Sequence, residues 1–320
     1  MDFDMIPEQA LDWHLAGRGA ALATVVETWG SAPRRVGSQL AISGTGEIAG
    51  SVSGGCVEGA VVVEALEALE TGAARLLEYG VSDGDAFAVG LACGGRIRVL
   101  VQPVGGAFAA DLLQDLVTRR ADRQAAAVIS APDGRVEGVV TEGFAERFRM
   151  DRSGFEEDGR FVAVHNPPLR LIVVGAVHIA QALVPMARAT GFDPAVIDPR
   201  ESFASAARFP DTRLLHDWPD EAVAELGLDA RTALVLLTHD PKLDDPALEA
   251  ALRSDCFYIG ALGSTRTQAS RRARMAHKGF DDSTLARIRG PVGLDIGAAN
   301  PAEIAVSILA ELVQVLRRGA

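Results

Sequence analysis

The sequence predicts an α/β protein of two domains: an N-terminal α+β domain and a C-terminal domain built on a doubly wound parallel sheet. The chain has 320 residues, more than one hydrophobic core usually supports. Two adjacent prolines in His165-Asn-Pro-Pro-Leu169 force extended backbone, which is typical of a linker. Short strands and turns precede these prolines, whereas strands and helices alternate after them. We therefore expect domains over residues 1–165 and 169–320.

In the first domain, short strands are separated by turn residues. Strands are predicted over residues 20–28, 39–42, 47–49, 74–79, 96–102, 125–130 and 135–140. Ser43-Gly-Thr-Gly46 and Pro132-Asp-Gly134 each join two strands as a hairpin. Helices are predicted over 57–69, where apolar residues recur at helical spacing, and over 107–120. Residues 147–161 give no clear pattern.

In the second domain, apolar strands alternate with helices. Strands are predicted over 169–174, 195–197, 213–215, 233–237 and 257–259, and helices over 179–190, 220–226, 246–253, 266–278 and 301–317. Runs rich in Val, Ile and Leu, such as Leu169–Val174, are typical of parallel strands covered on both faces. This order of elements predicts a Rossmann-like domain.

Composition excludes several classes of protein. A net charge of -12 argues against nucleic acid as a partner, because binding phosphate backbones requires a cationic face. No apolar run is long enough for a membrane span, and the acidic N-terminus lacks a signal-peptide core. The chain has three cysteines and no Cys/His cluster of zinc-binding spacing. We expect a cytoplasmic protein with free thiols.

Two of the cysteines are flanked by glycine. Cys56 lies in Gly54-Gly-Cys-Val-Glu58 and Cys93 in Gly90-Leu-Ala-Cys-Gly-Gly95. Glycine neighbours leave a sulfur uncovered and let a ligand approach the main chain, so Gly54, Gly55 and Gly94 are predicted to line a bound group. Cys256 has apolar neighbours instead and is predicted to be buried. The alternative for both glycine-flanked cysteines is a tight turn around a buried thiol.

Cys56 also lies at the start of the helix predicted from residue 57. Unpaired N–H groups and the helix dipole favour a thiolate at this position, with Glu58 partly opposing them. The loop Ser51–Gly55 is predicted to point its amides at an anion. Cys56 and Cys93 are therefore the candidate chemically active residues.

The first turn of the second domain resembles a dinucleotide-binding turn. Gly175-Ala-Val-His-Ile-Ala180 supplies the first glycine and the last small residue of that motif, and Asp198 supplies the acid that follows. Val177 replaces the middle glycine and would crowd a pyrophosphate. Arg200 would meet a 2′-phosphate, or is a solvated strand end. The alternative is a scaffold that binds another ligand or none.

Polar residues also follow the other strands of this domain. His178 and His239 are candidates for one crevice at the sheet edge, and Gly263 and Ser264 at a helix start would seat an anion. Each histidine has the alternative of a structural hydrogen-bonding role. In the first domain, the loop with Trp29, Arg34 and Arg35 would also suit an anion, although exposed loop arginines commonly do nothing specific.

Together these motifs resemble the XdhC/CoxI family. The resemblance covers the two glycine-flanked cysteines and the Gly175 turn. It also covers Thr238-His-Asp240, Tyr258-Ile-Gly-Ala-Leu-Gly-Ser264, Pro291-Val-Gly-Leu-Asp-Ile-Gly297 and Pro301-Ala-Glu-Ile-Ala-Val-Ser-Ile308. The match spans residues 29–102 and 171–315. It departs from the family at Val177, where glycine is frequent, and this puts nucleotide binding in doubt more than the family's role.

The resemblance implies an accessory factor for molybdenum hydroxylases such as xanthine dehydrogenase and carbon-monoxide dehydrogenase. Such a factor binds the molybdenum cofactor, protects it during sulfuration and inserts it into the apo-enzyme. The implied partners are the target dehydrogenase, a cysteine desulfurase and a second copy of the chain.

Molybdopterin carries a dithiolene-bound metal and a phosphate or nucleotide tail. Cys56 would contact the molybdenum or handle sulfur, with Cys93 second. The crevice residues would hold the tail: Gly175, His178, Asp198, Arg200, His239, Gly263 and Ser264. Two other classes of protein stay open, an NAD(P)-dependent oxidoreductase and a non-catalytic docking protein.

Overall fold

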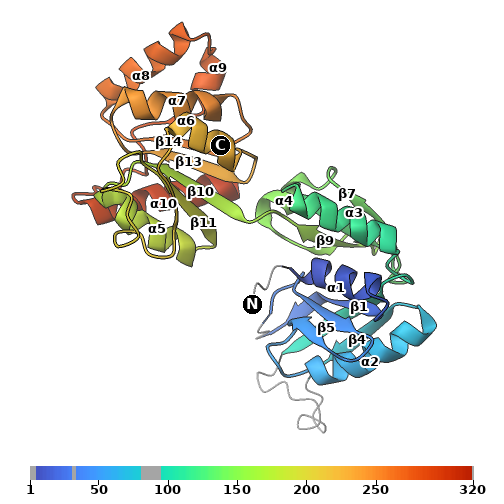
Figure 1. Ribbon diagram of the computed structural model, residues 1–320. Helices are drawn as coiled ribbons and strands as arrows, with labels where there is room; N and C mark the ends of the chain where they lie inside the picture. The colour runs from blue at the N-terminus through green and yellow to red at the C-terminus, as the bar shows by residue number, and fades with distance from the viewer. Residues whose placement is uncertain (1–4, 31–33, 81–94, 319–320) are drawn as a thin grey trace. The chain divides into compact units, whose positions relative to one another are not determined.

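The computed structural model describes residues 5–30, 34–80 and 95–318, and the chain divides into two compact units between Pro167 and Pro168 (Figure 1). The first unit contains two antiparallel sheets with helices, and the second contains a six-stranded parallel sheet. This confirms the fold class that the sequence predicts.

The larger sheet of the first unit has the order β3-β2-β1-β5-β4, and every neighbouring pair is antiparallel. Its strands are β1 (Ala20–Trp29), β2 (Gln39–Ser43), β3 (Ile48–Gly50), β4 (Arg75–Tyr79) and β5 (Arg96–Pro103). The second sheet has the order β7-β6-β9-β8, with β6 (Ala126–Ser130), β7 (Val136–Val140), β8 (Gly154–Phe155) and β9 (Phe161–His165). The helices are α1 (Ile6–Leu15), α2 (Glu58–Thr71), α3 (Ala110–Ala121) and α4 (Ala145–Met150).

Strand β1 is buried on both faces because its alternate residues meet different helices. Ala21, Ala23 and Val25 lie in one core with α2, whereas Leu22 and Val26 lie in another with α1, α3 and the second sheet. Helix α1 is not among the elements predicted from the sequence, although its buried residues follow helical spacing. Three other elements of this unit, α4, β8 and β9, are also absent from the prediction.

The second unit is a Rossmann-like sheet of order β12-β11-β10-β13-β14-β15, with all pairs parallel. Its strands are β10 (Leu169–Val174), β11 (Phe192–Ile197), β12 (Arg213–Leu215), β13 (Thr232–Leu236), β14 (Tyr258–Ala261) and β15 (Ile288–Arg289). The helices are α5 (His178–Ala189), α6 (Pro219–Leu226), α7 (Pro241–Leu252), α8 (Thr265–His277), α9 (Asp282–Leu285) and α10 (Pro301–Arg318).

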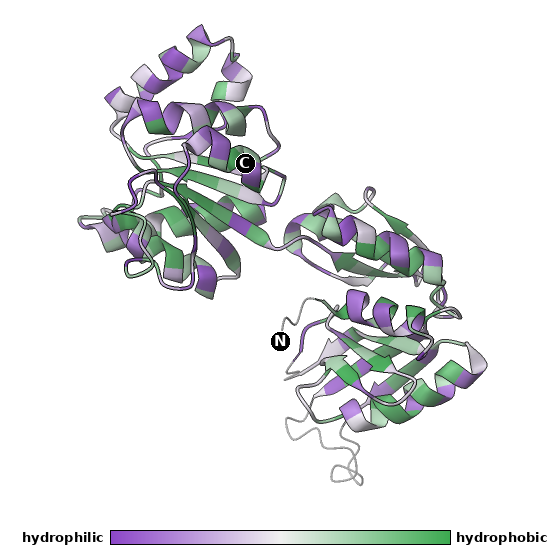
Figure 2. Ribbon diagram, viewed as in Figure 1, coloured by the Kyte–Doolittle hydropathy of each residue, from purple (hydrophilic) through white to green (hydrophobic). Residues whose placement is uncertain are grey.

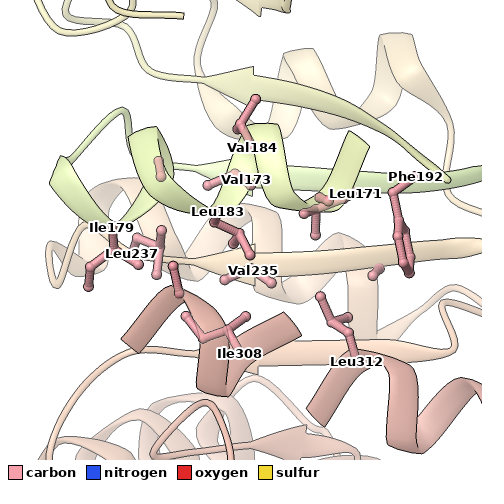
Figure 3. Close-up of a cluster of buried hydrophobic side chains, with 14 of the residues drawn as sticks. Leu171, Val173, Ile179, Leu183, Val184, Phe192, Val235, Leu237, Ile308 and Leu312 are labelled. Atoms are coloured by element: carbon pink, nitrogen blue, oxygen red, sulfur yellow. The ribbon is translucent and has the colours of Figure 1, made fainter. Parts of the chain in front are cut away.

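Helices cover both faces of this sheet. Leu171, Val173 and Val235 pack against α5 and α10, where Leu183 and Ile308 lie opposite them (Figure 3). The intervening strand residues face α6, α7 and α8. Figure 2 shows the apolar strands between helices that carry hydrophilic residues. The continuous apolar strands of the sequence arise from this double coverage.

Helix α7 begins five residues before the predicted start at Pro246. Asp240 is its N-cap and accepts a hydrogen bond from the N–H of Lys242 at 2.9 Å, and Pro241 occupies the first turn. Aspartate precedes both Pro241 and Pro246 in the sequence, and in the structure Asp240, before the first of these prolines, is the cap.

Candidate functional site

Several loops of the first unit meet at one end of its larger sheet. Gln39 pairs with Thr24 and Gly50 pairs with Leu40, so β3 ends where β2 begins, and β1 continues past this level to Trp29 toward the same end of the sheet. The loop with Arg34 and Arg35 and the loop with Cys56 therefore leave the sheet at the same end. β4 ends and β5 begins there too, while Cys93 and Gly94, from the segment between them, lie outside the described residues.

The loop before Cys56 is held by the carboxylate of Glu58. Oε1 accepts hydrogen bonds from Ser51 Oγ (2.7 Å), Val52 N (3.2 Å) and Ser53 N (2.9 Å), and Oε2 accepts from Ser53 Oγ and from Gly55 N (2.9 Å). Glu58 is only 7% exposed. The loop amides that are predicted to face an external anion are therefore largely bound to the protein's own anion.

Glu58 stays ionised despite its burial. Burial raises its pKa, but the hydrogen bonds from the hydroxyls of Ser53 and Ser51 and from the loop amides outweigh that effect and hold it at about 2. The carboxylate thus acts as a fixed negative charge that closes the loop around itself.

Cys56 is exposed, as the sequence predicts, and it precedes Val57, the N-cap of α2. Gly54 and Gly55 have φ angles of 81° and 114°, a region that favours glycine. A Cβ on Gly55 would meet no other described atom within 4 Å, so a ligand can approach the loop there. Cys256 is buried, and burial raises its pKa to about 11. The ionisation of Cys56 stays a prediction.

In the second unit, the residues predicted to bind a ligand follow the carboxyl ends of the parallel strands. Gly175 follows β10, Asp198 follows β11, His239 follows β13, and Gly263 and Ser264 follow β14. Gly175 has a φ of 107°, and a Cβ there would lie 2.7 Å from Thr238 Cγ2. The turns after β10 and β13 are therefore in direct contact, and only glycine fits between them.

Asp198 is engaged by protein donors on both oxygens. Oδ2 accepts from Ala176 N at 2.9 Å and from Arg200 Nη2 at 2.7 Å, while Oδ1 accepts from Arg200 N and Nε. Burial raises the pKa of Asp198, but these hydrogen bonds hold it below its usual value. Arg200 also stacks on Phe203, with its guanidinium carbon 4.1 Å from the ring centre.

This geometry counts against a nicotinamide dinucleotide bound in the usual Rossmann manner. A ribose would have to displace Arg200 from Asp198. Val177 caps α5 and packs partly buried against the core, in the place where a pyrophosphate needs bare backbone.

The remaining predicted residues are at the surface of this edge. His178 is exposed in the first turn of α5, and His239 is exposed with a φ of 62°, uncommon for a residue other than glycine. The Ser264 hydroxyl caps α8 by accepting from Thr267 N at 3.3 Å. Their roles in binding stay predictions.

A buried polar network that is not predicted from the sequence supports these loops. Thr238 donates to Asp244 at 2.6 Å, and Asp244 pairs with Arg271 at 3.3 Å. Arg271 donates to Gln268, which donates to the carbonyl of Ala261. The network ties α7 and α8 to the ends of β13 and β14. Its one sequence signal is the polar or charged type of Asp244, Gln268 and Arg271 at positions that α7 and α8 bury.

Clustered metal ligands and membrane-spanning helices are both lacking in the described residues. Within those ranges, no group of three or more His, Cys, Asp or Glu side chains is placed to hold a metal ion. No helix in the same part of the chain is long and apolar enough to cross a membrane.

The chain therefore has two units: the first carries an exposed thiol that follows two glycines, and the second is Rossmann-like. Residues 13–80 match the XdhC and CoxI family, and residues 171–312 match the XdhC Rossmann domain. The chain belongs to the XdhC/CoxI family.

Relatives match over most of the chain. It is 32% identical to the molybdenum cofactor insertion chaperone PaoD of Escherichia coli (strain K12), over 96% of this chain and 86% of PaoD. It is 26% identical to a probable xanthine dehydrogenase component of Bacillus subtilis (strain 168), over 93% of this chain and 94% of that protein. The crystal structure of a xanthine dehydrogenase from Bacillus halodurans is similar with a TM-score of 0.62 and 25% identity, and covers 98% of this chain and 96% of the other.

Proposed function

We propose that this protein is an insertion chaperone that binds the molybdenum cofactor, protects it during sulfuration and delivers it to an apo molybdenum hydroxylase of the xanthine dehydrogenase type. The similarity to an insertion chaperone over nearly the whole chain supports this role. The structural observation that carries it is the exposed thiol of Cys56 at the start of α2.

Each unit has its own candidate binding residues in this proposal. A thiolate at Cys56 is a soft ligand suited to the molybdenum or to its sulfur, with Cys93 as the second thiol. Considered by itself, the loop edge of the second unit, with Gly175, His178, His239, Gly263 and Ser264, is proposed to bind the nucleotide part of a cofactor that carries one. A cysteine desulfurase and a second copy of the chain are the further proposed partners. We place the protein in the cytoplasm, where an exposed thiol stays reduced.

Accessibility of the thiol is the first measurable consequence. Under native conditions at pH 8, iodoacetamide should alkylate Cys56 and spare Cys256, because Cys256 is buried and its pKa is raised to about 11. Peptide mass mapping after a time course reads this directly. Equal labelling rates at the two cysteines would contradict the described environment of Cys256.

The functional test replaces Cys56 by alanine. With Cys56→Ala as the only copy in cells, we expect the fold to persist, because the side chain is exposed, and the yield of active target hydroxylase to fall. The chaperone purified from molybdenum-replete cells should also lose bound pterin and molybdenum, measured by mass and metal analysis. Cys256→Ala is the control and should keep both. Unchanged dehydrogenase activity with Cys56→Ala removes this thiol from the function.

An NAD(P)-dependent oxidoreductase is the alternative: the Rossmann-like strand order favours it, whereas Val177 and the Asp198–Arg200 pair count against it. Titration with NADPH, followed by fluorescence and by turnover, separates it from a carrier. Saturable binding with turnover would favour the enzyme, and no response would favour the chaperone. A non-catalytic docking protein would carry no pterin after co-expression with the enzymes of cofactor synthesis.

A further inference from the structure

The first unit contains a polar pocket whose lining residues are not accounted for by the proposed role of Cys56. Its volume is about 260 Å³, and three arginines line it: Arg34, Arg35 and Arg120. Ser51, which donates to Glu58 in the Cys56 loop, also lines this pocket. The pocket therefore adjoins the loop that carries the thiol.

His165 presents a donor that lacks an acceptor. It is 7% exposed and lines the pocket, and Arg120 Nη1 lies 3.5 Å from its Nδ1. A guanidinium only donates, so Nδ1 accepts and the ring proton sits on Nε2. Nε2 is buried and has no hydrogen-bond partner within the described residues. Burial and the neighbouring charge of Arg120 lower the pKa of His165 to about 3, which keeps the ring neutral.

Asn166 presents the complementary group. Its amide nitrogen donates to the carbonyl of Phe148 at 2.7 Å and to Asp151, which fixes the orientation of the side chain. Its Oδ1 is buried without a partner in the described part of the chain. Because a buried donor or acceptor left unpaired costs about 1–3 kcal/mol, this wall is arranged for a ligand with both an acceptor and a donor.

The charges of the pocket favour an anion. Arg120 is paired with Glu8, and the carboxylate of Asp151 also lines the pocket. Arg34 and Arg35 add two more positive charges, and Arg35 is exposed with no side-chain ion pair among the described residues. The backbone fixes the turn carrying Arg35, since Gly37 N donates to Val25 O at 2.8 Å.

A larger groove of about 790 Å³ adjoins the pocket and shares Arg35, Asp151 and Ser153 with it. Phe155 and Met150 line the groove, and Phe155 is 40% exposed. Two of the groove's carboxylates are already neutralised: Glu27 pairs with Arg98 and Glu156 pairs with Arg147. A flat aromatic ring would find an apolar seat here beside the arginine pocket.

We propose that the arginine pocket and this groove together bind a phosphorylated heterocycle, with the phosphate at Arg34, Arg35 and His165 and the ring over Phe155. The phosphate would accept from the guanidinium groups and from His165 Nε2, and a ligand hydroxyl or N–H would donate to Asn166 Oδ1. A phosphorylated pterin and an ordinary nucleotide share this chemistry. The identification of the ring as the pterin of the cargo rests on the proposed function.

Calorimetry on the full chain tests the pocket with CMP, inorganic phosphate and cytidine as probes. We expect CMP and phosphate to bind and cytidine to bind much more weakly. Arg35→Met should weaken CMP binding about tenfold or more, because it removes a charge-assisted hydrogen bond. Arg135→Met, an exposed arginine of the β6–β7 hairpin, makes the same charge change outside the pocket and should leave binding unchanged.

His165 provides a second, independent variant. His165→Gln keeps a side-chain N–H near the position of Nε2 and should retain most of the CMP affinity, whereas His165→Leu should lose it. No binding of either phosphate probe, or equal effects of Arg35→Met and Arg135→Met, would overturn the proposal.

The cargo is tested separately by mass analysis of protein from molybdenum-replete cells. Molybdopterin retained by the unaltered chain but lost from Arg35→Met assigns the pterin to this pocket. Equal retention by both would overturn the pocket as the cargo site and leave the chaperone role intact. If CMP and phosphate bind but protein from molybdenum-replete cells contains no pterin, the pocket stands as a phosphate site and the proposed chaperone function is overturned.

Discussion

Glu58→Gln is the sharpest test of how the Cys56 loop is built. The change keeps the side-chain shape but replaces one acceptor oxygen by an amide that faces N–H and O–H donors. In the folded protein the carboxylate has a pKa of about 2 against 4.5 for an ordinary glutamate. At about 1.4 kcal/mol per pKa unit, this difference corresponds to about 3 kcal/mol. Because Gly54, Gly55 and Cys56 are exposed, solvent screens part of it, and we expect about 2 kcal/mol.

The sign of the pH dependence follows from the lowered pKa. The ionised carboxylate stabilises the fold fully above the unfolded pKa, and this contribution is lost as the pH falls toward the folded pKa. The difference in free energy of unfolding between the natural chain and Glu58→Gln should therefore shrink by more than half between pH 7 and pH 3.

Urea unfolding of the first unit measures this difference. Two of the three tryptophans, Trp13 and Trp29, lie in that unit, so a Trp218→Phe background makes fluorescence report on it alone. Glu70→Gln, an exposed glutamate of the same helix, is the control and should change stability by less than about 0.5 kcal/mol. Equal urea midpoints for Glu58→Gln and the natural chain at pH 7 would refute the role of Glu58.

Two further predictions concern the second unit, where urea unfolding can be followed by Trp218 fluorescence in a background without the other two tryptophans. Gly175→Ala should cost about 2 kcal/mol or more, because its φ is positive and its Cβ would lie 2.7 Å from Thr238 Cγ2. Gly191→Ala, at a φ of 88° in open space among the described atoms, should cost only about 1 kcal/mol, and equal losses would contradict the close contact. Asp244→Asn leaves Arg271 buried without its carboxylate and should cost about 3–5 kcal/mol. The neighbouring Asp245→Asn breaks a more exposed pair and should cost about 1 kcal/mol or less, and the reverse order would overturn this ranking.

The sequence predicts the second unit closely because its pattern is governed by burial. Leu169–Val174 coincides with β10, because runs rich in Val, Ile and Leu mark strands covered on both faces, and the predicted strand Arg213–Leu215 coincides with β12 at the edge of the sheet. β15 has only two residues, Ile288 and Arg289, too short for any periodic signal. In the first unit, α1 could have been predicted, because Ile6, Ala10 and Trp13 follow helical spacing within an otherwise acidic N-terminal segment.

The candidate site is only partly readable from the sequence, because residue type does not reveal which groups satisfy one another. The exposure of Cys56 follows from its glycine neighbours. By contrast, the hydrogen bonds from the loop amides to Glu58 form only because this side chain turns back over the start of its own helix, and residue type does not reveal that orientation. Asp198 likewise has the sequence position of a ribose ligand, but Arg200 two residues later occupies both of its oxygens.

The role of Glu58 decides how this end of the first unit can hold a negatively charged guest. The amides of Val52, Ser53 and Gly55 already donate to Glu58, and its fixed charge repels an anion placed on the loop. Cations must therefore come from side chains beside the loop, and the Arg34 and Arg35 turn at the same end of the sheet supplies them. A rigid, internally satisfied loop presents the thiol, and an adjoining arginine pocket would hold the charged group of the ligand. This division of tasks requires Arg35→Met to weaken binding of the anionic probe while leaving the alkylation rate of Cys56 unchanged.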